Sequence, residues 1–267
     1  MIRVGTSGFS FKDWTPAIYP ENLKKEDYLN YYRNELGFDS VELNVTYYTL
    51  LSLRSLQSMI NKTDPGFEFT VKAYKGITHD PFDYRIANRP NKNKIKEFCE
   101  VFSDSIRYLN QNSRYSIAIF QFPVFFYPSP ENYDYILQIK ENFSDIPMAI
   151  EFRNRKWIKE KTFAFLKDNS IAYCIVDEPK LDRLVPFCPR NTANIAYIRL
   201  HGRNKKWFNS PSSIRYDYLY TRSELLELLP GIKKVAESAG KTYIFFNNCH
   251  GGNAVTNAHM IKDMLGL

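Results

Sequence analysis

Acidic and basic side chains stand at alternate positions near the ends of several short apolar runs in this sequence. Glu42 lies in the run 39–44, Glu151 in another, and His201 in a third. Carboxyl and imidazole groups donate and abstract protons in catalysis when their surroundings bring the pKa close to the working pH. We therefore take Glu42, Glu151 and His201 as candidate catalytic residues for a hydrolase or isomerase reaction.

Cations and amides accompany these three residues. Arg153 and Arg199 can each hold a phosphate or carboxylate through two parallel hydrogen bonds. This favours an anionic or sugar-like ligand, held by a larger set of candidate binding residues: Ser7, Asn44, Lys72, His79, Gln121, Arg153, Arg199, Arg203, Asn247, Asn248, His250, Gly251 and Gly252. The sequence does not separate an enzyme from a protein that binds such a ligand without turning it over.

The stretch FFNNCHGG, residues 245–252, offers two kinds of chemistry. A glycine turn at Gly251 and Gly252 that leads into a helix exposes backbone N–H groups, which can hold an anion. Cys249 and His250 would instead have to approach each other to act as nucleophile and base. Neighbouring residues on a strand point to opposite faces, so the sequence favours the asparagines and the glycine turn over this pair.

The potential metal ligands form a further set. Oxygen and nitrogen ligands are available from Glu42, Glu151, Asp177, Glu178, His79, His201 and His250. The cations Lys72, Arg153 and Arg199 would lie among them, and cations repel a metal ion and attract an anion. We therefore predict no resident metal and no cofactor.

Eight short apolar or alternating runs predict the β-strands that position these residues. They span residues 2–8, 39–44, 67–73, 116–122, 147–153, 171–177, 195–202 and 242–248. Helical patterns lie between them, at residues 24–36, 50–62, 91–112, 130–142, 156–169, 221–239 and 253–265. The connection 178–193 contains three prolines, which leave little room for a helix. This alternation predicts an α/β fold, a (β/α)8 TIM-type barrel formed as one domain by residues 1–267.

The predicted lumen of this barrel is charged. Side chains two residues apart on a strand share a face, and Ile150 and Phe152 alternate with Glu151 and Arg153. Because helices cover the outside of such a barrel, the apolar set must face outward and the polar set inward. The charges would form either a ligand site at the C-terminal mouth or a buried salt-bridge network that fixes strand register. Within the predicted lumen, Glu68 lies farthest from the C-terminal mouth. It is the best candidate for a residue with a purely structural ion-pairing role.

Two long connections, residues 73–92 and 202–220, would border the mouth. In the second, Lys205 and Lys206 stand next to Trp207, with further aromatic residues behind them. Basic groups bind phosphates and aromatic rings stack on bases. Nucleic acid is therefore an alternative partner, with an endonuclease-like activity, unless these aromatic residues simply fold back onto the barrel.

The overall composition narrows the class of protein. A net charge of +7, from 36 basic and 29 acidic residues, gives only a modest preference for an anionic partner. The 4 cysteines are widely spaced without a zinc-type grouping, which predicts reduced thiols. No apolar run approaches the roughly 18 residues of a membrane helix, and the first residues lack a secretory pattern. We expect a soluble, cytoplasmic protein with no membrane partner.

Several motifs together resemble those of a known family. They are GTSG (5–8), ELNVTYY (42–48), FTVKA (69–73), FQFP (120–123), AIEFR (149–153), YIRLHGR (197–203) and FNN (246–248). In this order, over nearly the whole chain, they resemble the YecE-like proteins, classed as domain of unknown function seventy-two. The resemblance implies a TIM-type barrel, broadly likened to the endonuclease IV and sugar-isomerase barrels whose metals bind at strand ends.

The resemblance supplies no reaction. Members of the family often carry an acidic residue directly after the paired asparagines, where this chain has Cys249. That departure argues against transferring a metal site to this position.

Overall fold

A computed structural model describes residues 1–112, 114, 116–208 and 210–267. Its described residues form one sheet of eight parallel strands, in the spatial order β1-β8-β7-β6-β5-β4-β3-β2. The strands are β1 (Ile2–Thr6), β2 (Ser40–Leu43), β3 (Glu68–Lys72), β4 (Ser116–Gln121), β5 (Met148–Glu151), β6 (Ala172–Asp177), β7 (Ile195–Leu200) and β8 (Lys241–Phe246). Each lies within or beside its predicted run, and most end one or two residues earlier.

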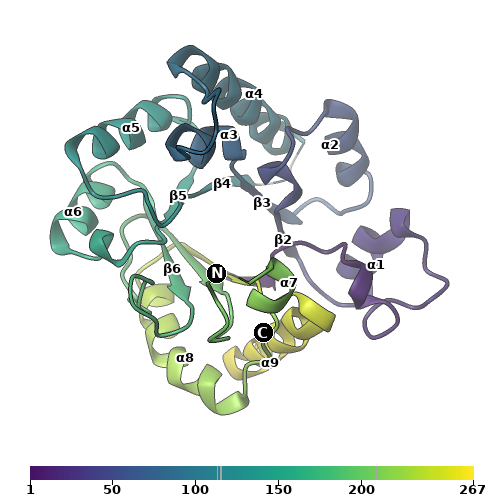
Figure 1. Ribbon diagram of the computed structural model, residues 1–267. Helices are drawn as coiled ribbons and strands as arrows, with labels where there is room; N and C mark the ends of the chain where they lie inside the picture. The colour runs from purple at the N-terminus through teal and green to yellow at the C-terminus, as the bar shows by residue number, and fades with distance from the viewer. Residues whose placement is uncertain (113, 115, 209) are drawn as a thin grey trace.

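The sheet closes on itself between its first two strands. β1 pairs with β8 along its whole length, and a parallel bridge joins Ser7 to Glu42 on the other side. The larger helices surround the strands (Figure 1). The predicted (β/α)8 TIM-type barrel is therefore confirmed.

The seven predicted helices are present within a few residues of their expected bounds. They are α1 (Tyr28–Asn34), α2 (Leu53–Ile60), α4 (Lys92–Gln111), α5 (Pro130–Glu141), α6 (Glu160–Asp168), α8 (Arg222–Glu237) and α9 (Asn253–Leu265). At the start of α8, Thr221 and Glu224 form a capping box, in which each side chain accepts a backbone N–H of the first turn. The proline-rich segment between β6 and β7 contains no helix among its described residues.

Shorter helical turns occupy the connections. The two long connections at the mouth contain α3 (Lys75–Thr78) and α7 (Ser212–Arg215), where the sequence predicted only loops. The 3-10 turns are η1 (Lys12–Trp14), η2 (Lys25–Asp27), η3 (Val45–Tyr47), η4 (Asp80–Phe82), η5 (Arg155–Trp157) and η6 (His250–Gly252). Several of these turns follow directly on strand ends, so they carry residues to the rim of the barrel.

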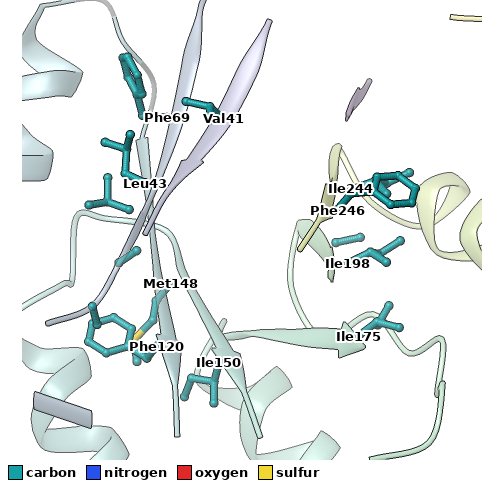
Figure 2. Packing of buried hydrophobic residues seen from close by; sticks show 14 of the residues in the cluster. Val41, Leu43, Phe69, Phe120, Met148, Ile150, Ile175, Ile198, Ile244 and Phe246 are labelled. Atoms are coloured by element: carbon teal, nitrogen blue, oxygen red, sulfur yellow. The ribbon is translucent and has the colours of Figure 1, made fainter. Parts of the chain in front are cut away.

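The main hydrophobic core lies between the strands and the surrounding helices. The outward side chains of the strands pack there, among them Val41, Phe69, Ile150, Ile198 and Phe246 (Figure 2). Burying an aliphatic or aromatic side chain of this size contributes about 1.5–3 kcal/mol. The predicted outward orientation of the apolar set is therefore confirmed, and it forces the alternate residues into the lumen.

The lower lumen is apolar, although the sequence predicted a charged interior. Ile119 pairs in register with Ala149, and Tyr197 lies between Cys174 and Tyr243, so these side chains share the inner face. They form a second buried cluster inside the barrel. The buried charges are therefore concentrated near the C-terminal ends of the strands. Glu68, at the other end of β3, pairs instead with Lys241, 2.6 Å away.

Candidate functional site

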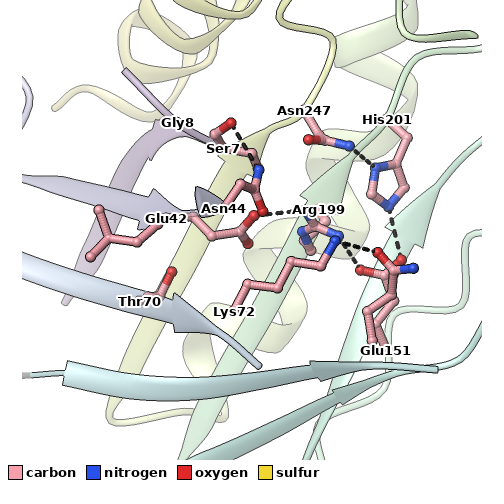
Figure 3. Close-up of polar contacts among 12 residues, drawn as sticks. Ser7, Gly8, Glu42, Asn44, Thr70, Lys72, Glu151, Arg199, His201 and Asn247 are labelled. Atoms are coloured by element: carbon pink, nitrogen blue, oxygen red, sulfur yellow. Dashed lines mark hydrogen bonds and ion pairs between the residues drawn. The ribbon is translucent and has the colours of Figure 1, made fainter. Parts of the chain in front are cut away.

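The centre of the upper lumen is the guanidinium group of Arg199, the fifth residue of β7. Its Nη2 lies 2.6 Å from Oε1 of Glu42, and its Nη1 contacts Oε2 of Glu151 (Figure 3). All three side chains are essentially inaccessible to solvent. Arg199 thus bridges the two carboxylates that the sequence predicted as an acid/base pair. The hydroxyl group of Tyr197 also contacts Glu42, 2.8 Å from Oε2.

Glu151 carries a stable negative charge. Burial alone would raise its pKa, but Arg153 and Arg199 hold the pKa well below its usual range. Arg153 contacts Oε1 through Nε, and Nε2 of His201 lies 3.2 Å from the same oxygen. A carboxylate in this state is a poor proton donor at neutral pH.

His201 is neutral. Burial, together with the charge of Arg153, lowers its pKa from the usual 6.5 to about 3. The side-chain amide of Asn247 lies 3.0 Å from Nδ1 of His201. With the amide nitrogen donating this hydrogen bond, the single ring proton is on Nε2, the nitrogen that lies 3.2 Å from Glu151.

A third carboxylate completes the buried group. Arg153 donates from Nη1 to Oε2 of Glu178, 2.9 Å away, and the backbone N–H of Val185 donates to Oε1. Burial raises the pKa of Glu178 to about 7. We use the name buried charge cluster for these six residues: Glu42, Glu151, Arg153, Glu178, Arg199 and His201.

A cavity of about 800 Å³ lies at the C-terminal mouth. We call it the mouth cavity; it is lined by Ser7, Phe11, Lys12, Asp13, Asn44, Tyr47, Tyr48, Lys72, His79, Gln121, Arg215, Tyr216, Asn247, Cys249 and His250. Seven of the residues predicted from the sequence are among them, namely Ser7, Asn44, Lys72, His79, Gln121, Asn247 and His250. The three predicted catalytic residues are not, because they are buried in the barrel.

Lys72 is the charged group that reaches from the lumen into this cavity. It is the last residue of β3, and its Nζ donates to Oε1 of Gln121 at 2.9 Å. The ammonium group also lies 4.6 Å from the centre of the Tyr47 ring. Burial and the charge of Arg199 lower the pKa of Lys72 from its usual 10.5 to about 7. Lys72 therefore exchanges a proton near neutral pH.

His79 and Gln121 form the wall beside Lys72. Nε2 of His79 lies 3.5 Å from Nε2 of Gln121, and its Nδ1 lies 2.9 Å from the hydroxyl of Thr78. Burial, followed by the charge of Lys72, lowers the pKa of His79 to about 3. The imidazole is therefore neutral and offers a nitrogen atom to the cavity.

Two buried polar atoms beside the mouth cavity lack a hydrogen-bond partner among the described residues. They are Oγ of Ser7 and Oδ1 of Asn44. Nδ2 of Asn44 donates to the carbonyl oxygen of Ser7 at 2.9 Å, which fixes the amide in this orientation. A buried polar atom without a partner costs free energy, so this wall of the cavity favours a polar ligand.

Other predicted binding residues lie away from the mouth cavity. Arg203 binds both oxygens of Asp177 and contacts Glu227. Asn248 is buried, and its amide donates to the carbonyl oxygen of Tyr218 and to Asn257. Asn247 therefore faces the mouth cavity and Asn248 does not. Strand alternation alone does not determine which of the two faces inward.

The glycine turn is occupied by an acidic side chain. The backbone N–H of Gly251 donates to Oδ2 of Asp13 at 2.7 Å, and Nδ1 of His250 lies 3.3 Å from the same oxygen. Gly252 is buried. Cys249 is also buried, its thiol faces the carbonyl oxygen of Ser7 at 3.5 Å, and burial raises its pKa. His250 pairs with Asp13 rather than with this thiol.

The connection 202–220 folds back onto the barrel. Trp207 is only 4% exposed, and its ring lies 5.7 Å from the guanidinium of Arg153. Tyr216 packs edge-on against Trp207, and Tyr220 is buried with its hydroxyl 2.7 Å from Oδ2 of Asp177. Asn209 lies outside the described residues. Trp207, Tyr216 and Tyr220 therefore cover one side of the mouth, whereas Phe208 is exposed.

Sequence reasoning missed several residues of the mouth cavity. Tyr47 and Tyr48 follow the second strand by a few positions, so their place at the mouth was readable from the strand end. Asp13 and Tyr216 belong to long connections, whose folding depends on tertiary contacts that no periodicity encodes. Glu178 was considered only as a metal ligand, whereas the structure makes it the partner of Arg153.

Two negative findings concern the described part of the chain. It contains no group of three or more His, Cys, Asp or Glu side chains arranged to hold a metal ion. None of its helices combines the length and the apolar character needed to cross a membrane.

We expect the contribution of His201 to stability to be lost as the pH falls from about 6.5 toward 4, because the unfolded chain then protonates His201 while the folded protein does not. Glu151, whose pKa is also depressed by folding, adds a loss of the same sign at lower pH. The free energy of unfolding of His201→Asn, measured with urea, should change less with pH in this range than that of the wild-type protein. His250→Asn removes an exposed histidine and is the variant for comparison. An unchanged slope in His201→Asn would contradict a buried, neutral His201.

Comparison with known proteins identifies the family. The model of the family described as "Protein of unknown function DUF72" matches residues 3–267. The UPF0759 protein YunF of Bacillus subtilis (strain 168) is 30% identical over 284 residues, which cover 100% of this chain and 95% of YunF.

Two solved structures support the same assignment. A DUF72 family protein (TM1631) from Thermotoga maritima MSB8 is 42% identical with a TM-score of 0.90, and the match covers 100% of both chains. A DUF72 family protein (ef0366) from Enterococcus faecalis V583 is 28% identical with a TM-score of 0.85, covering 100% of this chain and 96% of that one. The resemblance found in the motifs is thereby confirmed, and this chain belongs to the DUF72 family of proteins of unknown function.

Proposed function

We propose that the mouth cavity binds a small anionic or sugar-like ligand, one that carries a phosphate, a carboxylate or several hydroxyl groups. The observation that carries this proposal is the position of Lys72. Its amine lies in a cavity walled by amides, a hydroxyl and an imidazole, and among the described residues no carboxylate forms an ion pair with it. A ligand anion would supply the missing counter-charge.

The state of Lys72 supports the same ligand class. Its pKa of about 7 means that the protein destabilises this ammonium group, because burial and Arg199 oppose the charge. An anion bound next to Nζ would raise this pKa. Binding above neutral pH would then be accompanied by uptake of a proton, which calorimetry in buffers of different ionisation enthalpy detects.

The buried charge cluster has a supporting role in this proposal. Glu42, Glu151 and His201 are buried and do not border the cavity, so they fix the position of Arg199 and the local potential instead of touching the ligand. Lys72 and His79 border the cavity directly. Acid/base chemistry of the hydrolase or isomerase kind would therefore run through these two residues, with Gln121 between them.

Nucleic acid fits the site less well. Trp207 and Tyr220 are buried, so they offer no free ring face for stacking on a base, and Arg203 is paired with Asp177. We expect no salt-sensitive retention of the protein on single-stranded DNA or RNA columns. Strong retention at low salt that is lost with added salt would favour the nucleic-acid alternative.

The direct test of the proposed function is a calorimetric titration of the wild-type protein with a small panel. The panel contains inorganic phosphate, citrate, gluconate, free hexoses and pentoses, and their phosphate esters. We expect at least one member to bind with one site per chain and with proton uptake above pH 7. Failure of every member to bind would contradict the proposal.

A further inference from the structure

We propose that Lys72 forms a Schiff base with a carbonyl group of the ligand in the mouth cavity. The inference rests on the proposed function, and it adds a covalent step and a substrate class. The ligand would be an aldehyde or ketone that also bears a phosphate, a carboxylate or several hydroxyl groups, such as an open-chain sugar phosphate or a keto acid.

The geometry first places a primary amine where a ligand can reach it. Lys72 ends β3, so its side chain rises from the lumen into the mouth cavity, in which the other lining lysine, Lys12, is exposed at the rim. Nζ is held by one hydrogen bond to Gln121 and rests beside the face of Tyr47. The amide oxygen of Gln121 is neutral, so it orients the amine without stabilising its protonated form. An ion pair with a carboxylate would stabilise that form.

The surroundings of Lys72 keep part of its amine neutral. Charged or titratable groups act on it from several elements around the lumen: Glu42 from β2, Tyr47 from η3, His79 after α3, Glu151 and Arg153 from and after β5, and Arg199 from β7. Burial and Arg199 are the largest influences, and both oppose the ammonium form. Only the neutral amine has the free electron pair that attacks a carbonyl carbon.

The reaction balances without an added oxidant or reductant. The electron pair of Nζ forms a bond to the carbonyl carbon, and the carbonyl oxygen takes up a proton to give a carbinolamine. The C–O bond then breaks, nitrogen forms the C=N bond, and the oxygen leaves with a second proton as water. Nitrogen gives up its two protons in these steps, so one carbonyl compound and one amine give one imine and one water. Uptake of one proton from solvent then gives the protonated imine.

The buried carboxylates favour the product of this reaction. A protonated imine carries a positive charge at the position of Nζ, and Glu42 and Glu151 offset part of the opposition that burial and Arg199 impose on a cation there. Such an imine withdraws electrons from the neighbouring carbon atoms. His79, neutral and on the same wall, is placed to exchange a proton with the ligand at that stage.

The test uses pyridoxal 5′-phosphate, an aldehyde that bears a phosphate, as the probe. The full-length protein is incubated with it, reduced with borohydride, digested and mapped by mass spectrometry. We expect the reduced adduct mainly on Lys72, with labelling that rises through a pH of about 7. Glyoxylate with cyanoborohydride serves as a smaller anionic aldehyde.

Two controls separate this inference from the proposed function. Pyridoxine 5′-phosphate has the same shape and phosphate but no aldehyde, so it reports non-covalent binding by calorimetry. Lys72→Arg keeps a cation but has no primary amine, so it should lose the adduct. Binding of pyridoxine 5′-phosphate without an aldehyde adduct on Lys72 would overturn the Schiff base and leave the proposed function standing. Absence of both binding and adduct, for the pyridoxal and glyoxylate probes alike, would overturn the inference together with its basis.

Discussion

Replacing Arg199 with methionine is expected to lower the free energy of unfolding by about 3–5 kcal/mol, the usual effect of removing one partner from a buried ion pair. Arg199 is 1% exposed and contacts both Glu42 and Glu151, which are fully buried. The variant would leave both carboxylates with less opposing charge in a medium that solvates them poorly. Urea unfolding at neutral pH measures the loss.

The matched control is Arg190→Met, because Arg190 contacts Glu160 at 2.7 Å with both side chains more than half exposed. An exposed pair of this kind contributes at most about 1 kcal/mol. The difference in free energy of unfolding between Arg199→Met and the wild-type protein should become smaller as the pH is lowered. Protonation then neutralises the two buried carboxylates that have lost their partner. A loss no larger than that of the control would contradict an essential role of the buried charge cluster in the fold.

Replacing Lys72 with methionine is expected to reduce the affinity for the best-binding anion of the panel by about 10- to 150-fold. This range corresponds to the loss of one charge-assisted hydrogen bond of about 1.5–3 kcal/mol. We expect the variant to fold, because burial already opposes the charge of Lys72, as its pKa of about 7 indicates. Calorimetric titration of the folded variant measures the change, and circular dichroism checks the fold.

Lys12→Met is the control for this experiment, since Lys12 also lines the mouth cavity but is exposed. A rim charge contributes less than a buried one, so its loss should weaken binding only about fivefold or less. Equal effects of the two substitutions would indicate general attraction of anions by the surface. No effect of either would place the ligand outside the mouth cavity.

The fold was readable from the sequence because its signals are local. Alternation of residues such as Glu151 and Ile150 assigns each strand two faces, and helical patterns between the strands leave a closed parallel barrel as the consistent architecture. The capping box at Thr221 and Glu224 is a signal of the same local kind, since its residues are neighbours in sequence.

The candidate site was predictable only in part. Alternation correctly placed Arg199 and Lys72 in the lumen, but it carries no information on depth along the barrel axis. The sequence left open whether the charges form a buried network or a ligand site. It did not separate Glu42 and Glu151, which lie buried with Arg199, from Lys72, which borders the cavity. Contacts made by the long connections were likewise inaccessible, because they depend on packing between segments far apart in the chain. The pairing of His250 with Asp13, 3.3 Å apart, is one example.

A crystal structure of the wild-type protein with the tightest-binding compound of the panel is the most direct measurement of the central claim. We expect the ligand in the mouth cavity, with its anionic or hydroxyl groups in hydrogen-bond contact with Lys72 and with Ser7 or Asn44. We also expect Glu42 and Glu151 to remain paired with Arg199 beside it. A ligand bound elsewhere on the molecule, with the mouth cavity holding only water, would contradict the proposed function.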